Sequence, residues 1–127
     1  MHIFKNIKPE FIDKRGAITK ILDDGKTVIK SVLLITSKKG TVRANHFHKK
    51  DSHYCYVLSG KVKILDKPVR SGRVTSAILN KGDMVLTLPM HAHSFRFLKD
   101  TVFLTFAMKF RSQKDYESDT VRVTTVE

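Results

Sequence analysis

Short apolar runs separated by turn-forming residues recur along the chain, and apolar residues almost never repeat at a helical spacing. The runs are rich in valine, isoleucine, threonine and phenylalanine, which favour extended backbone on a pleated surface. We therefore predict β-strands over residues 17–22, 27–36, 41–47, 53–60, 61–65, 73–79, 84–89, 93–98 and 101–110. The polar tail is expected to begin with a helical turn, and residues 120–126 alternate like a strand. This pattern is typical of an all-β sandwich or barrel.

Two of these runs, residues 27–36 and 101–110, are apolar on both faces. Such runs indicate central strands with one face packed against the partner sheet. The other face would pack against the tail or against a second subunit. Because a small open sandwich needs its sheet edges covered, we expect a homodimer.

The length of 127 residues suits a single domain over residues 1–127 with one core. No apolar run is long enough to cross a membrane, and residues 1–10 lack the apolar stretch of a secretory signal. Cys55 is the sole cysteine, so no internal disulfide can form. These features predict a cytoplasmic protein.

The formal net charge of +12 favours anionic ligands. The basic residues are scattered or stand in short pairs such as Lys38 and Lys39, and they form no long tract. This distribution argues against nucleic acid and membranes as partners and favours a small anionic molecule.

Histidines are concentrated in the middle of the chain, and three of the six fall at positions 46, 48 and 53. Because side chains alternate along a strand, His46 and His48 face the same way. His53 and His93 begin further strands and share a face with the apolar residues at alternate positions. If these faces point inward, four imidazoles converge to ligate a divalent metal or to transfer protons near neutral pH. A packing role is the alternative for each ring.

Two motifs give the chain a resemblance to the cupin family. The first motif is matched at its glycine, histidine, histidine and glycine positions by Gly40, His46, His48 and Gly60. The second is matched by a Gly-Asp pair and a histidine eleven residues after the glycine, namely Gly82, Asp83 and His93. The usual glycine before that histidine is absent. The resemblance implies an all-β, cupin-type jelly-roll sandwich or barrel.

His53 stands where metal-dependent cupins typically carry a glutamate. This departure has two interpretations within the family. In the first, His46, His48, His53 and His93 form a four-histidine site that would hold Fe, Zn, Ni or Mn. In the second, metal binding has been lost.

A narrower resemblance, to nucleotide-sugar ketoisomerases and epimerases, covers three stretches in family order. They are FIDKRG (11–16), VRANHFHKK (42–50) and DYESDTVR (115–122). The resemblance implies conversion of a dTDP-4-keto-6-deoxyhexose to its 3-keto isomer, or a related epimerisation, in deoxysugar or surface-polysaccharide biosynthesis. Ala44 and Asn45 depart from the usual family residues, which leaves the identity of the sugar open.

The same resemblance implies proton transfer without a cofactor. His46 would remove the proton at C3, next to the C4 ketone, and His48 would pass protons or polarise the ketone. The residues expected to bind the nucleotide-diphosphate sugar are Arg43, Arg15, Lys49, Tyr54 and Phe95. The arginines and the lysine suit phosphate oxygens. The tyrosine would stack a base or supply an acid, with packing as its alternative, and the phenylalanine would form a pocket wall.

Strand parity places one condition on this site. Arg43 lies three residues before His46, so a regular strand would direct the two side chains to opposite faces. Arg43 can therefore join the site only through a bulge or twist near Ala44, or in the site of a neighbouring subunit.

Two other functions remain open from the sequence. One is a metal-dependent cupin, either a dioxygenase or a metal-assisted isomerase, that uses the four histidines. The other is a non-catalytic module that binds a sugar or a nucleotide.

Overall fold

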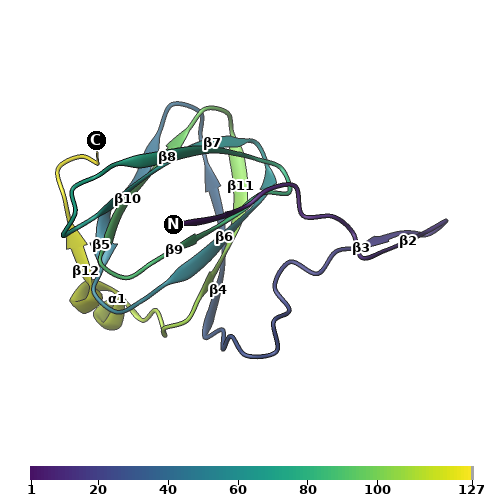
Figure 1. Ribbon diagram of the computed structural model, residues 1–127, viewed down its shortest axis with the longest axis horizontal. Coiled ribbons are helices and arrows are strands. Elements are labelled where there is room, and N and C mark those ends of the chain that lie inside the picture. The colour runs from purple at the N-terminus through teal and green to yellow at the C-terminus, as the bar shows by residue number, and fades with distance from the viewer. Residues whose placement is uncertain (127) are drawn as a thin grey trace.

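Two five-stranded antiparallel sheets face each other and enclose the apolar core (Figure 1). The first sheet has the order β1 (His2–Phe4), β9 (Met84–Thr87), β6 (His53–Ser59), β11 (Thr101–Ala107) and β4 (Ser31–Ser37). The second has the order β12 (Thr120–Arg122), β5 (Val42–His48), β10 (His91–Phe97), β7 (Lys61–Pro68) and β8 (Thr75–Asn80). The structure is a computed structural model that describes residues 1–126. It confirms the all-β sandwich predicted from the sequence.

The core consists of the inward-facing residues of both sheets. Val57, Ile64, Leu79, Val85 and Phe103 are each at most 3% exposed and pack in one cluster. Each lies at an inward-facing position of a different strand, and its neighbours in sequence point to the opposite face. Removal of these side chains from water is the main favourable term in folding. The sandwich therefore rests on the alternation seen in the sequence.

The position of β4 corrects the prediction of a central strand over residues 27–36. β11 does lie inside the first sheet, between β6 and β4, as its two apolar faces indicated. β4 begins at Ser31 and is the outermost strand, and its outward-facing Val32 and Leu34 are 62% and 66% exposed. The tail, which was one candidate to cover this face, lies on the second sheet instead.

β1 was not predicted, although it completes the opposite edge of the first sheet. It pairs with β9 in antiparallel register, and Ile3 packs against the core. A strand of three residues with a single partly buried side chain is too short to show an alternation of apolar and polar residues in the sequence. Its existence depends on the tertiary partner, β9.

After β1 the chain leaves the sandwich and forms a hairpin of β2 (Phe11–Asp13) and β3 (Gly16–Ile18). Figure 1 shows this hairpin projecting away from both sheets. Phe11, Ile12 and Ile18 are all more than half exposed on it. The strand predicted over residues 17–22 is confirmed only in its first part.

The tail covers the free edge of β5 in the second sheet. Ser112 caps α1 (Gln113–Asp119) by accepting a hydrogen bond from the amide of Asp115. β12 then pairs with β5, and Val126 packs into a second, smaller apolar cluster. The predicted helical turn is confirmed, and the strand predicted over residues 120–126 covers residues 120–122. Among residues 1–126, no helix has the length and apolar character needed to span a membrane.

Candidate active site

A β-bulge at Ala44 and Asn45 directs both Arg43 and His46 into the sandwich. The two bulge residues have left-handed backbone angles, with φ of 71° and 54°. Arg43 and His46 are three residues apart in β5, whereas their partners in β10 are two residues apart. The bulge that strand parity required is therefore present at the predicted place.

Three histidines from two neighbouring strands converge inside the sandwich. His46 and His48 lie on β5, and His93 lies on β10 directly opposite His46. One ring nitrogen of each histidine lies within 4.8 Å of a ring nitrogen of both others. The ring centroid of His46 is 4.7 Å from that of His48 and 4.8 Å from that of His93. The convergence expected from strand alternation is confirmed for these three residues.

Hydrogen bonds fix the tautomers of His48 and His93. His93 Nδ1 lies 3.0 Å from the carbonyl oxygen of His91, so this nitrogen carries the ring proton and donates a hydrogen bond to that oxygen. The Thr120 hydroxyl donates to the carbonyl oxygen of Tyr116 and therefore accepts from His48 Nδ1, which is 3.2 Å away. Nε2 of both rings is left with a lone pair, and in His48 this atom is buried with no hydrogen-bond partner among residues 1–126. Such lone pairs can accept a proton or ligate a metal.

His53 lies behind this group. Its ring centroid is 5.3 Å from that of His93 and 5.7 Å from that of His48. Its Nε2 is 2.9 Å from the Thr87 hydroxyl, and its Nδ1 is 3.4 Å from the sulfur of Cys55. Burial raises the pKa of the Cys55 thiol to about 12, so the thiol stays protonated. Within residues 1–126, the ligand set expected from four histidines is thus reduced to a close group of three.

Burial keeps all four rings neutral at pH 7. It is the main cause that lowers the pKa of His46, His48 and His93 to about 4, and repulsion from neighbouring imidazoles and from Arg111 adds to it. Burial also holds the pKa of His53 well below its usual range. The site therefore offers unprotonated nitrogens near neutral pH.

Arg111, which the sequence analysis did not select, lies beside the histidines. Its guanidinium donates from Nε and Nη2 to one carboxylate oxygen of Asp51, at 3.2 and 3.0 Å. It also stacks on Tyr116, 5.3 Å from the ring centroid, and that ring lies 6.2 Å from His46 and 5.7 Å from His48. Two features of the sequence could have indicated these residues. Arg111 directly follows an apolar run, and Tyr116 belongs to the tail stretch that is similar to the ketoisomerases.

Two cavities share Arg111 and Tyr116 in their walls. We call the first the lumen cavity; it has a volume of about 320 Å³ and is also lined by Arg43, His46, His53, His93, Phe95 and Phe103. We call the second the lysine cavity; it has a volume of about 530 Å³ and is also lined by His48, Lys30, Lys49, Lys50 and Lys109. Both volumes suit small-molecule ligands. Arg43, Lys49 and Phe95 thus line cavities beside the histidines.

Two of the predicted substrate-binding residues lie elsewhere. Tyr54 is on the outer face of the first sheet, where its ring lies 6.2 Å from that of Phe4. It therefore takes the packing role that was its alternative. Arg15 lies on the projecting hairpin, where it is 80% exposed and pairs with Asp13 at 2.7 Å. Within one chain it does not reach the histidines, because the hairpin extends away from the sandwich (Figure 1).

A comparison with protein families gives a match to the model of the polysaccharide biosynthesis C-terminal domain over residues 11–121. A comparison with curated proteins gives no match.

Solved structures similar to this chain include enzymes that act on dTDP sugars. A sugar 3,4-ketoisomerase from Thermoanaerobacterium thermosaccharolyticum, in complex with TDP, superposes with a TM-score of 0.77 at 26% identity, over 97% of this chain and 88% of that chain. A dTDP-4-dehydrorhamnose 3,5-epimerase from Sulfolobus tokodaii gives a TM-score of 0.75 at 22% identity, over 89% of this chain and 72% of that chain. A capsular polysaccharide assembling protein from Staphylococcus aureus gives 0.70 at 21% identity, over 91% of this chain and 32% of that chain. These similarities confirm the cupin-type jelly-roll fold that the sequence motifs implied.

Proposed function

Because the chain belongs to the polysaccharide biosynthesis C-terminal domain family, we propose that it is a nucleotide-sugar isomerase or epimerase of deoxysugar or surface-polysaccharide biosynthesis. The observation that carries the proposal is the neutral ring of His46 in the wall of the lumen cavity. It lies beside His48 and His93, whose tautomers are fixed by hydrogen bonds. The solved ketoisomerase and epimerase show that this fold supports such chemistry in other chains.

The proposed reaction uses the histidines as acid–base groups. A neutral imidazole can accept a proton, and His46 removes the one at C3 of a 4-keto hexose bound in the lumen cavity. An enediol forms, and a proton is then returned at C4 in an isomerase or at the original carbon in an epimerase. His48 passes protons through its unprotonated Nε2 or polarises the ketone.

The proposed substrate is a dTDP-linked sugar. The ketoisomerase of known structure was solved with TDP, and the net charge of +12 favours an anion of this kind. Arg43 and Lys49 provide positive charge in the lumen cavity and the lysine cavity for the diphosphate. Arg43 uses Nε and Nη2 for Ser37 and Thr36, which leaves its Nη1 for the ligand.

Replacement of His46 by asparagine tests the proposal. We expect His46→Asn to lower kcat by roughly 10²- to 10⁴-fold, the usual effect of losing a positioned acid–base group. The assay is proton NMR of dTDP-4-keto-6-deoxyglucose in heavy water, which follows both product formation and deuterium incorporation. His2→Asn is the matched control, because His2 is an exposed residue of β1.

Two results would contradict this assignment in different ways. A wild-type protein that binds dTDP but neither turns over the sugar nor exchanges its C3 proton would be the non-catalytic binding module. A His46→Asn variant with the wild-type rate would remove His46 from the role of base and leave the enzyme assignment in place.

A metal-assisted cupin reaction is the second candidate, favoured by the close group of His46, His48 and His93. Their neutral nitrogens suit a transition-metal ion, and Nδ1 of His48 and of His93 donates to a hydroxyl and to a carbonyl, as is common in metal-ligating histidines. These three residues would hold Fe, Zn, Ni or Mn, and such an ion would supply Lewis-acid polarisation of a substrate carbonyl. In this reaction His46 would serve as a ligand.

Plasma mass spectrometry of freshly purified protein separates the two candidates. A resident metal predicts about one equivalent per chain, its loss in His93→Ala, and its retention in His53→Ala, because His53 lies outside the close group. Chelation would then abolish turnover. Full turnover by metal-free protein would instead rule out the metal-assisted reaction.

We further propose that the protein forms a homodimer in the cytoplasm. Val32 and Leu34 on β4 and Ile12 on the projecting hairpin are each more than 60% exposed, which favours contact with a second copy. Arg15, at the tip of that hairpin, would then lie within reach of the second subunit.

A further inference from the structure

Arg111 is a nearly buried cation whose hydrogen-bonding capacity is only partly used. Its side chain is 15% exposed, and both of its bonds to Asp51 go to the same oxygen, Oδ2. Nη1 donates no hydrogen bond within residues 1–126, and Oδ1 of Asp51 is buried without a partner there. An arginine that paired with a carboxylate for structure alone would be expected to use both oxygens.

A contribution to folding stability does not explain why Arg111 and Asp51 are paired in this way. Taking two charges out of water is costly, and the attraction between them offsets that cost only when the geometry is excellent and the remaining polar atoms are satisfied. Here two donors share one acceptor, and the second acceptor has no donor. The arrangement holds the guanidinium in place and leaves donors available.

Arg111 lies beside the histidines. Its side chain lines both the lumen cavity and the lysine cavity. It rests on the ring of Tyr116, which in turn contacts the histidine group from α1. Arg43 is the other cation in the wall of the lumen cavity, and its free Nη1 is already assigned to the diphosphate in the proposed function. The histidines themselves are neutral.

We propose that Arg111 is a catalytic residue that donates hydrogen bonds to the oxyanion formed at C4 of the hexose. This proposal rests on the proposed isomerase function. When His46 takes the C3 proton, the electron pair of the C3–H bond forms the C3=C4 double bond. The π electrons of the C4 carbonyl move onto its oxygen, which becomes negative. A fixed guanidinium stabilises this charge, because it needs no reorganisation at the moment of reaction.

The second half of the reaction balances the first. The hydroxyl at C3 gives its proton to the enediolate oxygen at C4, with His48 as the group that passes it, and the C3 carbon becomes the new ketone. The proton held by His46 is delivered to C4. Asp51 acts through Arg111 as a positioning residue, since it fixes the guanidinium by two hydrogen bonds.

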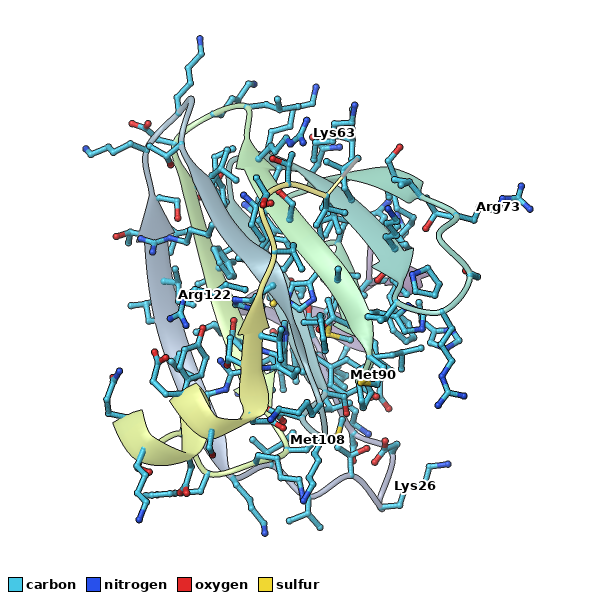
Figure 2. All side chains as sticks on the ribbon, turned by 90° about the vertical axis from the view of Figure 1, so that its left-hand side faces the viewer. Lys26, Lys63, Arg73, Met90, Met108 and Arg122 are labelled. Atoms are coloured by element: carbon cyan, nitrogen blue, oxygen red, sulfur yellow. The ribbon has the colours of Figure 1, made fainter. Side chains whose placement is uncertain are left out.

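Arg111→Gln alone would leave Asp51 as a buried unpaired charge, so the test uses the double variant Arg111→Gln with Asp51→Asn as well. The double variant removes both charges together and keeps side chains that can hydrogen-bond. The control is Arg73→Gln, because Figure 2 shows Arg73 at the tip of a loop on the opposite side of the molecule from α1. Thermal unfolding of all variants verifies that each is folded.

We expect the double variant to lose roughly 10²- to 10³-fold in kcat, the usual effect of removing an oxyanion donor. Deuterium exchange at C3 should fall by the same factor, since it requires the same enediolate. Affinity for dTDP, measured by calorimetry, should change by less than about twofold, because dTDP carries no ketone. Arg73→Gln should match the wild type in all three measurements.

Three results would overturn the assignment. A double variant with near wild-type turnover would show that Arg111 and Asp51 are a structural pair. A loss of dTDP affinity as large as the loss of turnover would move Arg111 to the phosphates. Wild-type protein without turnover would reject the proposed function and this assignment together, whereas an active wild type with either of the first two results rejects the assignment alone.

Discussion

At the scale of single residues, Ala44 has a backbone conformation that its side chain disfavours. Its φ is 71°, where the Cβ atom of any residue except glycine is crowded. The strain persists because the bulge is what directs Arg43 and His46 to the same face. The residue that would relieve the strain is glycine, which has no Cβ atom.

We predict that Ala44→Gly stabilises the protein by about 1 kcal/mol, because glycine adopts positive φ without steric cost. The measurement is the midpoint of urea denaturation at an unchanged slope. Ala17→Gly is the control, since Ala17 is an exposed residue of β3 without positive φ, and this change should be neutral or slightly destabilising. A lower midpoint for Ala44→Gly would show that the Cβ atom makes contacts worth more than the strain.

The sequence predicts the positions of the histidines but not the groups that hydrogen-bond to them or lie beside them. Alternation along a strand is a local property, so it correctly placed His46, His48 and His93 on inward faces. Thr120, which fixes the tautomer of His48, is 72 residues away in sequence. Arg111 could not be selected either, because its role depends on Asp51, which lies at a separation of 60 residues.

At the scale of elements, the turn by which the chain passes from β6 in the first sheet to β7 in the second depends on a glycine. Gly60 has φ of 101°, and a Cβ atom built there would lie 2.6 Å from the Cα atom of Thr101. This distance is far below ordinary contact, and the neighbour is backbone that cannot rotate away. Close approach of β11 to the turn therefore requires glycine at this position.

We predict that Gly60→Ala destabilises the protein by roughly 2–4 kcal/mol, through backbone strain and the clash together. Gly72→Ala is the matched control, because Gly72 also has positive φ, at 72°, but a Cβ atom there meets nothing within 4 Å. Its cost should be about 1 kcal/mol. Equal costs for the two variants, measured by urea unfolding, would show that β11 relaxes away from the turn without penalty.

The elements that the sequence failed to place are those whose position depends on pairing. All nine strand runs predicted between residues 17 and 110 overlap a strand, although β3 ends four residues before its predicted end and β4 begins four residues after its predicted start. β4 was given a central position because its sequence is apolar on both faces, yet it lies at the edge of its sheet. Apolar content indicates that a face needs covering, but it does not say whether a strand or another subunit covers it.

At the scale of the whole molecule, the apolar face of β4 and the projecting hairpin are the surfaces expected to join two subunits. We predict that the wild-type protein sediments as a dimer and that Leu34→Asp sediments as a monomer, because a carboxylate in an apolar contact is costly to desolvate. Ile78→Asp is the control, since Ile78 is 43% exposed on β8 in the second sheet. A wild-type protein that sediments as a monomer would contradict the homodimer, and dissociation by both variants would place the contact elsewhere.

The tail connects the stability of the molecule to the state of its site. Lys49 donates its amide to the carbonyl of Asp119, and the Asp119 carboxylate accepts from the amides of Lys50 and Asp51. The segment from α1 to β12 thus supplies Tyr116 to the cavity walls and Thr120 to His48 while it is attached at an edge of the sandwich. Fraying of this edge would release His48 to rotate and change its tautomer while the core remains folded. Proteolytic nicking in the tail should therefore inactivate the protein before it unfolds, and a ligand in the lumen cavity should slow the nicking.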